Sequence, residues 1–266
     1  MSGQSKNIVV TAKKPTFIRP LHFGFQKETW LAKAHGKHVL VHRYNKDAIY
    51  IPNVSVLKSV RHPNIQRFLF ECKDDEGFVI LAFSFIEGQS LFEVLKHASS
   101  HLDIPLRIKI LHDLATGLHY LHKASLLHGD IKPSNVILRN RDLRGIWIDL
   151  CALPAKPSSQ GAVYFGTPPY IAKEVMDGSY PTEASEVFAF GVLCLAFLSG
   201  VLPPAETTLS KGWQRHCLEK IRLPSEVRAL LSALDNSLSD DPTKRPPILV
   251  VKKTLKKAIK RLQTKK

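Results

Sequence analysis

A short polar loop in front of an apolar strand constrains this chain more than any other stretch. Residues 128–135 read His-Gly-Asp-Ile-Lys-Pro-Ser-Asn, and the apolar run 136–138 follows directly. In this spacing Asp130 can accept a hydroxyl proton, Lys132 can neutralise a phosphoryl group in transfer, and Asn135 can hold a metal ion. A random polar loop rarely matches so many positions, so the loop predicts a phosphoryl-transfer site or a descendant of one.

Several motifs together resemble eukaryotic protein kinases. Residues 128–135 resemble the catalytic loop His-Arg-Asp-x-Lys-x-x-Asn, residues 149–151 (Asp-Leu-Cys) resemble Asp-Phe-Gly, and residues 166–174 resemble the segment ending in Ala-Pro-Glu. The resemblance covers about residues 17–262. It implies an α+β, bilobal protein kinase-like fold after a flexible basic lead-in at 1–15 and before a basic tail at 263–266. A small, mainly β N-lobe is expected at about 16–84 and a larger, mainly α C-lobe at about 88–262.

The resemblance also implies roles for individual residues. Asp130, Lys132 and Asn135 take the catalytic positions, while Asn135 and Asp149 take the metal positions, with ATP and Mg²⁺ as cofactors if the protein is active. The residues that it places at the nucleotide are Gly24, Lys27, Leu40, His42, Phe83, Phe85 and Ile137.

Other positions of the larger lobe are expected to be structural. Glu174 would pair with Arg245, and Glu186 would anchor the catalytic loop in place of the usual aspartate. Gly129 replaces the arginine that often grips a phosphorylated residue, so control through Ser158, Ser159 or Tyr164 is not expected.

The first third of the chain departs from the kinase pattern. Residues 21–30 match the glycine-rich loop, whose glycines let backbone amides approach phosphates, but Gly24 alone remains of the three glycines. His22 and Lys27 hold the other two positions. Asn53 stands where kinases carry the glutamate that pairs with the third-strand lysine, so that partner is also absent.

The third strand, 38–44, carries the largest departure. His42 lies in the lysine position and Leu40 in the alanine position of the kinase Val-Ala-Val-Lys strand. Because side chains alternate along a strand, Leu40 and His42 share the nucleotide face and Arg43 points away. A one-residue shift that brought Arg43 inward would turn the apolar set over. With an unperturbed pKa of about 6.5, a histidine is mostly neutral at pH 7 and supplies no fixed cation.

The spacing of apolar residues predicts further elements. Residues 17–41 suit two or three strands with a hairpin turn at 34–37, and 78–85 suits a buried strand. Helices are expected at 54–60, at 91–97 with Ser90 as its N-cap, at 106–122, at 187–198 as a buried helix, and at 251–266.

Composition limits the class of protein and its partners. The 266-residue chain has a net charge of +15, which favours acidic partners, although a basic surface that serves solubility explains it equally well. The helix at 251–266 carries eight Lys and Arg and no acid, either as a solvated face or as a patch for acidic partners or nuclear import. The four cysteines are scattered and predict neither a disulfide framework nor a zinc site. Residues 1–14 have no apolar signal core and 187–198 is too short to span a bilayer, so a cytoplasmic or nuclear chain is expected.

Three interpretations stay open. The preferred one is a pseudokinase, a kinase-like signalling module that acts as a scaffold or allosteric partner of another protein, with weak or absent ATP binding. The second is an active serine/threonine kinase in which Lys27 replaces the lost lysine, as residues 130–135 and Gly166-Thr167 resemble serine/threonine-type kinases. Residues 21–24, 57–59 and 126–132 further resemble the PDZ-binding kinase (T-LAK-cell-originated kinase) branch. A nucleic-acid-binding protein is a remote third, which rests on charge alone.

Overall fold

The chain forms two compact units in a computed structural model that describes residues 14–98, 102–155, 166–205 and 209–264. The first unit joins the chain up to Val54 with Arg67–Phe85, and the second joins Ser55–Gln66 with Ile86–Lys266. The second unit therefore receives a short stretch from the N-terminal part of the chain. Most of the expected lead-in at 1–15, the segment with Ser158, Ser159 and Tyr164, and the last two residues lie outside the described residues.

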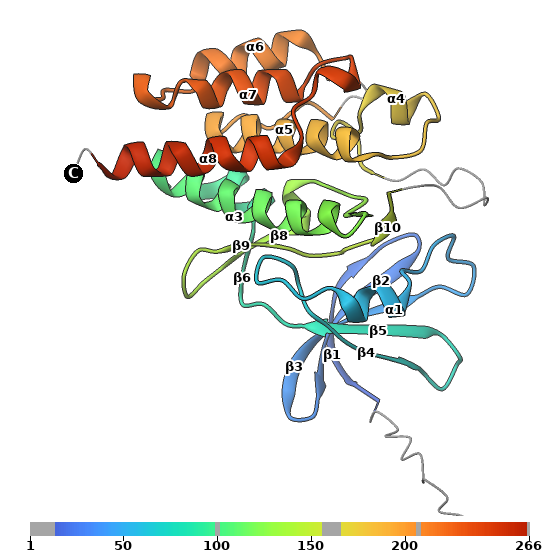
Figure 1. The fold of residues 1–266 in the computed structure, drawn as a ribbon. Helices are drawn as coiled ribbons and strands as arrows, with labels where there is room; N and C mark the ends of the chain where they lie inside the picture. The colour runs from blue at the N-terminus through green and yellow to red at the C-terminus, as the bar shows by residue number, and fades with distance from the viewer. Residues whose placement is uncertain (1–13, 99–101, 156–165, 206–208, 265–266) are drawn as a thin grey trace, which may run out of the picture. The chain divides into compact units, whose positions relative to one another are not determined.

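An antiparallel sheet with strand order β1-β2-β3-β5-β4 makes up the first unit (Figure 1). Its strands are β1 (Thr16–Phe23), β2 (Lys27–Ala34), β3 (Lys37–Tyr44), β4 (Phe68–Lys73) and β5 (Val79–Ser84). The predicted turn between β2 and β3 is confirmed: His35 and Gly36 have φ of 47° and 75°, the left-handed pair that a two-residue hairpin requires. The buried strand predicted at 78–85 is confirmed as β5.

The pleat of this sheet separates two sets of side chains. Val39 and Val41 of β3 join Ala32, Ile80 and neighbouring residues in an apolar cluster on one face. Since side chains alternate, Leu40 and His42 lie on the opposite face. The facing of β3 that the sequence predicted is therefore correct.

Helices dominate the second unit (Figure 1). They are α1 (Val54–Ser59, whose first residue belongs to the first unit), α2 (Leu91–Glu93) with the π-helical turn η1 (Val94–Ala98), α3 (Ile104–Lys123), α4 (Lys173–Met176), α5 (Glu183–Ser199), α6 (Lys211–Lys220), α7 (Ala229–Ser237) and α8 (Ile248–Gln263). Short strands pair as β6 (Gly88–Ser90), β8 (Val136–Arg139) and β9 (Gly145–Trp147) in one sheet and β7 (Leu126–Leu127) with β10 (Leu153–Pro154) in another. Single 3₁₀ turns lie at η3 (Pro133–Asn135), η4 (Ser225–Val227) and η5 (Pro242–Lys244).

Helix α5 runs through the core of the second unit, as its apolar sequence predicted. Thr182 and Ser185 form a reciprocal capping box at its start, and Gly200, with φ of 74°, ends it. Its side chains from Ser185 to Leu198 are all buried. A helix buried on all sides can carry a polar side chain only where that side chain has partners, and Glu186 is such a residue.

Helices α3 and α8 pack against one another (Figure 1). Asp103 caps α3 by accepting from the Leu106 N–H, so the helix begins earlier than the predicted residue 106. Val251 and Leu255 of α8 are fully buried, whereas Ile259 and Leu262 are half-buried. No helix in the described ranges has both the length and the apolar character that a membrane span needs.

Candidate active site

The loop between β7 and β8 folds around the amide of Asn135. The Asn135 side-chain nitrogen donates to the Asp130 backbone oxygen and to the Asp130 carboxylate, both at 2.8 Å. The turn η3 closes the loop, with the Asn135 N–H donating to the Lys132 carbonyl at 3.1 Å. The sequence therefore brings Asp130, Lys132 and Asn135 together, as it predicted.

Asp130 lies at the centre of a polar network. Its carboxylate accepts from Lys132 Nζ at 2.7 Å and from the Thr167 hydroxyl at 2.8 Å. Lys132 also donates to the Thr167 oxygen at 2.7 Å. About a fifth of each of the Asp130 and Lys132 side chains is exposed, at 19% and 23%, so the carboxylate is held in one orientation and still reaches solvent. An oriented, accessible carboxylate next to a cation can accept a hydroxyl proton.

His128 supports this loop from inside the second unit. Its ring is fully buried and packs 5.1 Å from Trp147, and burial lowers the pKa of His128. The neutral ring then donates from Nε2 to the Ile148 carbonyl at 3.1 Å, while Nδ1 accepts from the Asp130 N–H at 3.3 Å. His128 thereby ties the backbone of Asp130 to the strand that leads to Asp149.

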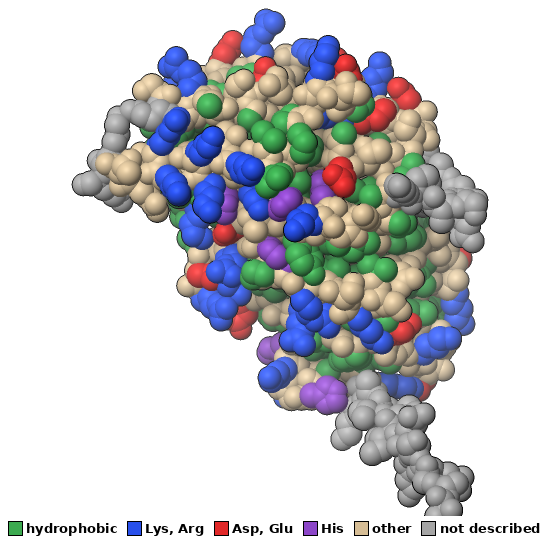
Figure 2. Space-filling view, in the orientation of Figure 1, with side chains coloured by type: hydrophobic (Ala, Val, Ile, Leu, Met, Phe, Trp, Pro, Cys, Tyr) green, Lys and Arg blue, Asp and Glu red, His purple; other side chains and the backbone are tan. Residues whose placement is uncertain are grey.

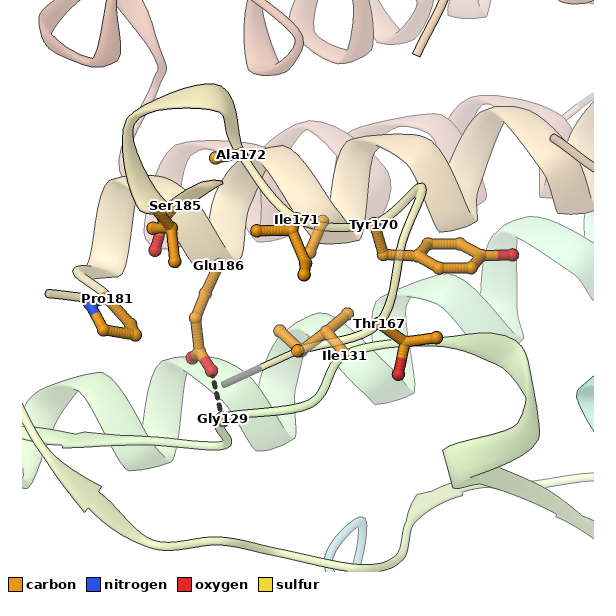
Figure 3. A pocket seen from close by; sticks show the side chains of 12 residues that line it. Gly129, Ile131, Thr167, Tyr170, Ile171, Ala172, Pro181, Ser185 and Glu186 are labelled. Carbon is orange, nitrogen blue, oxygen red and sulfur yellow. Dashed lines mark hydrogen bonds between the residues drawn. The ribbon is translucent and has the colours of Figure 1, made fainter. Parts of the chain in front are cut away.

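Gly129 connects the loop to α5. Its N–H donates to Glu186 at 2.8 Å, and Figure 3 shows Glu186 pointing from the helix toward it. The other carboxylate oxygen of Glu186 lies 2.9 Å from Nε2 of His122. The prediction that Glu186 anchors the loop is confirmed.

The arginine that kinases often carry at the position of Gly129 has no room here. Gly129 has a φ of 91°, and a Cβ at this position would lie 2.8 Å from the Cβ of Cys151. Cys151 and Leu153 fill that space. The loop therefore excludes a phosphate-gripping side chain by packing as well as by sequence.

A small cavity adjoins Gly129 and Glu186. Ile131 and Ile171 point toward one another across it (Figure 3). Its volume of about 30 Å³ has room for a water molecule and not for a nucleotide.

Asp149 leaves β9 in the left-handed conformation, with φ of 59°. The preceding residue, Ile148, donates its N–H to the Asn135 carbonyl at 3.0 Å, which ties the two predicted metal ligands together through the backbone. Because the Asn135 amide nitrogen donates to Asp130, the Asn135 side-chain oxygen is the atom that would bind a cation. An amide oxygen and a carboxylate are the hard ligands that Mg²⁺ prefers, so these residues fit the ion, which would neutralise phosphoryl charge. Their role as ligands stays a prediction. No three His, Cys, Asp or Glu side chains of the described residues converge on a metal site.

The first unit shows where the predicted nucleotide residues lie. His42 is 3% exposed, with its ring 5.1 Å from Phe83 and 6.4 Å from Tyr44. Leu40 pairs directly opposite Phe83 across β3 and β5. On the other face, Arg43 contacts Asp74 at 2.6 Å and Glu76 at 2.7 Å, so its side chain points away from His42.

Lys27 begins β2 on the same face as His42. It pairs opposite Tyr44, its Nζ lies 5.7 Å from the Tyr44 ring, and Thr29 pairs opposite His42. The turn before it is tight: the Gly24 N–H donates to the Lys27 carbonyl at 3.0 Å. Lys27 therefore lies diagonal to His42, because its partner Tyr44 is two residues from His42 in β3.

The two remaining predicted residues are Phe85 and Ile137. Phe85 packs 6.0 Å from the His38 ring, at the end of the first unit. Ile137, in the second unit, pairs with Ser90 and Ile146 in the β6-β8-β9 sheet.

Other site features are clear only in the structure. Thr167 joins the Asp130 network, although the sequence marked it only as part of a serine/threonine-type signature. Trp147 donates to the Leu114 carbonyl at 3.0 Å and is fully buried, which no sequence signal indicated. The predicted pair of Glu174 and Arg245 is confirmed, with two contacts at 2.6 and 3.0 Å.

Comparison with known proteins agrees with this geometry. Residues 28–259 match the family described as protein kinase domain. The chain belongs to this family. It is 28% identical over 206 residues to CBL-interacting protein kinase 26 of Oryza sativa subsp. japonica, covering 76% of this chain and 41% of the relative. It is 30% identical over 206 residues to CBL-interacting serine/threonine-protein kinase 24 of Arabidopsis thaliana, covering 75% and 45%. Myosin light chain kinase family member 4 of Homo sapiens is 29% identical over 161 residues, covering 59% and 41%.

These matches establish a protein kinase domain whose relatives include serine/threonine kinases. The chain spans less than half the length of these three relatives. Kinases of this family generally use ATP and Mg²⁺. The resemblance to the PDZ-binding kinase branch stays a prediction.

Proposed function

We propose that this kinase domain works as a pseudokinase, a scaffold or allosteric partner of another protein with weak or absent ATP binding. The observation that carries the proposal is the setting of His42, which is 3% exposed and enclosed by Phe83 and Tyr44. In the kinases that the chain resembles, a lysine at this strand position binds the phosphates. An imidazole is not a permanently charged group, so this position lacks the fixed cation that a lysine supplies.

The neighbouring residues support the same proposal. Leu40 stands where the kinases that the chain resembles carry the smaller alanine, and it pairs opposite Phe83. Two large side chains therefore lie next to one another across β3 and β5. Asn53 replaces the glutamate that would pair with the lysine. When both members of an ion pair are absent, no unpaired charge is left buried, so the fold tolerates the loss.

A protein partner is the second part of the proposal. The names of two relatives describe kinases that interact with another protein, CBL, and we extend to this chain only the general mode of acting through a protein partner. The network of Asp130, Lys132 and Thr167 would then keep a defined surface on the second unit.

A ligand titration tests the nucleotide part. Thermal unfolding of the full chain would be followed with rising Mg-ATP, with an ATP-binding kinase in the same buffer as the positive control. We expect little or no shift at millimolar nucleotide. A ligand that binds the folded state stabilises it by about 2.7 kcal/mol at 100 times its Kd. A stabilisation that grows with concentration in this way would contradict the proposal.

A second candidate function is an active serine/threonine kinase in which Lys27 supplies the cation. The observation that favours it is the register of β2 and β3, which puts Lys27 on the face of His42 and diagonal to it. Diagonal neighbours in an antiparallel sheet lie about 7–8 Å apart, within reach of a lysine side chain. Asp130 and Asn135 keep the arrangement that the chemistry needs.

Phosphoryl transfer from Mg-ATP to a generic basic protein tests this candidate. It expects measurable transfer that falls roughly 10³-fold or more in Lys27→Ala, by analogy with other phosphate-stabilising cations. Lys33→Ala, an exposed lysine at the far end of the same strand, is the matched control and should keep the rate. Transfer that survives both Lys27→Ala and Asp130→Asn would rule the candidate out.

A further inference from the structure

One face of the second unit concentrates positive charge. Blue side chains run along α8 in Figure 2, with purple histidines beside them. We define the α3–α8 basic face by its cations and histidines: Lys109, His112, His119 and Lys123 of α3, Lys252, Lys253 and Lys256 of α8, with His62 and Arg144 beside them. Helix α8 itself contains no acid.

Lys252 lies at the centre of this face. It is half-buried, and its pKa is lowered by burial and then by Lys256, Lys123 and Lys253. No carboxylate of the described residues lies within 4.0 Å of its ammonium group. A half-buried cation surrounded by cations holds a positive potential that the protein itself does not relieve.

Three histidines surround Lys252 without relieving that potential. Burial lowers the pKa of His62, His112 and His119, and Lys252 lowers each further. Asp113 is the acid that acts on these histidines: it raises the pKa of His112 and contacts Lys109 at 3.2 Å. At the edge of the face, Asp142 contacts Arg144 at 3.9 Å. The other neighbours lower these pKa values further: Lys109, Lys123, His122, Arg144, Lys253 and Lys256. Of these, His122 contacts Glu186 at 2.9 Å.

The spacing of the lysines along α8 costs the fold stability. Like charges four residues apart on a helix destabilise it by about 0.2–0.5 kcal/mol a pair, and α8 contains such pairs at 252/256, 253/257, 256/260 and 257/261. A surface that serves solubility intersperses both signs. A binding surface for a polyanion explains both this cost and the absence of acids from α8.

We propose that the α3–α8 basic face binds the phosphate backbone of double-stranded nucleic acid without sequence preference. The lysines and arginine of α8 run from residue 252 to residue 261, about 14 Å along a straight helix. Duplex DNA offers a negative charge about every 1.7 Å of its axis, so a row of lysines meets many phosphates at once.

Other polyanions fit the face less well. Helix α8 carries no aromatic side chain on which an unpaired base could stack, which argues against a single strand. Among the described residues of α3 and α8, Val250 is the one large hydrophobic side chain that is exposed, so little apolar surface could enter a lipid headgroup layer. The proposal is independent of ATP binding and of phosphoryl transfer.

Fluorescence anisotropy of the full chain with a labelled 20-base-pair DNA duplex of arbitrary sequence tests the proposal over a range of NaCl concentrations. Binding should weaken linearly in log Kd against log salt. The triple variant Lys252→Gln, Lys253→Gln and Lys256→Gln should lower the slope by about 2.7, because each phosphate that a lysine neutralises accounts for about 0.9 of it. The matched control, Lys211→Gln, Lys220→Gln and Lys244→Gln, removes the same charge from exposed sites of the second unit and should leave the slope unchanged.

The outcomes separate the alternatives. Equal weakening by both triple variants, or no duplex binding by the unchanged protein, overturns the proposal. Binding to phosphatidylserine vesicles or to polyglutamate in preference to the duplex also overturns it, and assigns the face to a membrane or an acidic protein. A second measurement needs no variant: NMR titration of the histidines should show that the duplex raises the pKa of His112 and His119, and unchanged pKa values would count against duplex binding at this face.

Discussion

Replacing Glu186 by alanine should destabilise the second unit more than any exposed substitution on α5. Glu186 is 5% exposed and accepts from the Gly129 N–H at 2.8 Å, with its other oxygen 2.9 Å from His122. Removing the carboxylate leaves the Gly129 N–H and the His122 ring nitrogen without their partner. It also opens space inside the unit.

The size of the loss follows from these hydrogen bonds. A buried donor left without its acceptor costs about 1–3 kcal/mol, and more where the lost partner is charged. Because Glu186 serves two partners, we expect Glu186→Ala to lower the free energy of unfolding by about 3–5 kcal/mol. Glu186→Gln keeps an acceptor for Gly129 and a polar group beside His122, so about 1–2 kcal/mol is expected, the worth of a charged hydrogen bond over a neutral one.

Urea denaturation followed by tryptophan fluorescence measures both values. Trp147, which is fully buried 5.1 Å from His128, reports on the region that Glu186 anchors. Glu183→Ala is the matched control on the same helix: its side chain is 52% exposed and lies 3.8 Å from the same histidine. It should change stability by less than about 0.5 kcal/mol. If Glu186→Ala and Glu183→Ala differ by less than about 1 kcal/mol, the anchoring role assigned to Glu186 is wrong.

Three further predictions concern packing, the ion pair and pH. Gly129→Ala should cost about 1–3 kcal/mol because backbone strain at a φ of 91° adds to a clash with Cys151. The control Gly178→Ala, at a φ of 98° with open space around it, measures the strain alone. Urea denaturation compares the two variants, and equal losses would show that packing against Gly129 is unimportant. Arg245→Met should cost about 3–5 kcal/mol because its side chain is fully buried on Glu174, and the double variant with Glu174→Ala should lose less than the sum of the single losses in a double-mutant cycle; additive losses would refute the pairing. The free energy of unfolding should fall as pH drops below about 6.5. Burial lowers the pKa of His112 and His128 in the folded state, so below that pH the unfolded chain binds more protons than the folded one. Urea midpoints at pH 7.5, 6.5 and 5.5 should therefore decline, and more steeply in the unchanged protein than in His112→Gln; equal slopes would contradict the assignment.

The sequence predicted best where one physical rule dominated. The apolar run of α5 and the alternation of β3 determined which side chains are buried, so the burial of 187–198 and the opposed facing of His42 and Arg43 could be predicted. The loop at Asp130 could be predicted because its motif is local: Lys132 and Asn135 lie within five residues of Asp130 and both bind its carboxylate.

Contacts between distant residues were harder to predict. Thr167 reaches Asp130 across 37 residues and Trp147 reaches Leu114 across 33, and no pattern within either segment indicates the pairing. The same limit applies to the α3–α8 basic face. The sequence showed the lysines of α8 but not that Lys252 would lie among the histidines of α3, because that depends on how the two helices pack.

The two halves of the kinase pattern carry unequal weight as evidence for activity. The partners of Asp130, namely Asn135, Lys132 and Thr167, lie in its own unit and hold the loop in shape whether or not a phosphoryl group is transferred. The survival of that network is therefore explained by folding alone. A lysine at the position of His42 would be explained by phosphate binding, since burying an unpaired ammonium group there is costly. The ring at this position, which packs on Phe83, is thus the more informative observation, and it is the one that supports the proposed loss of nucleotide binding.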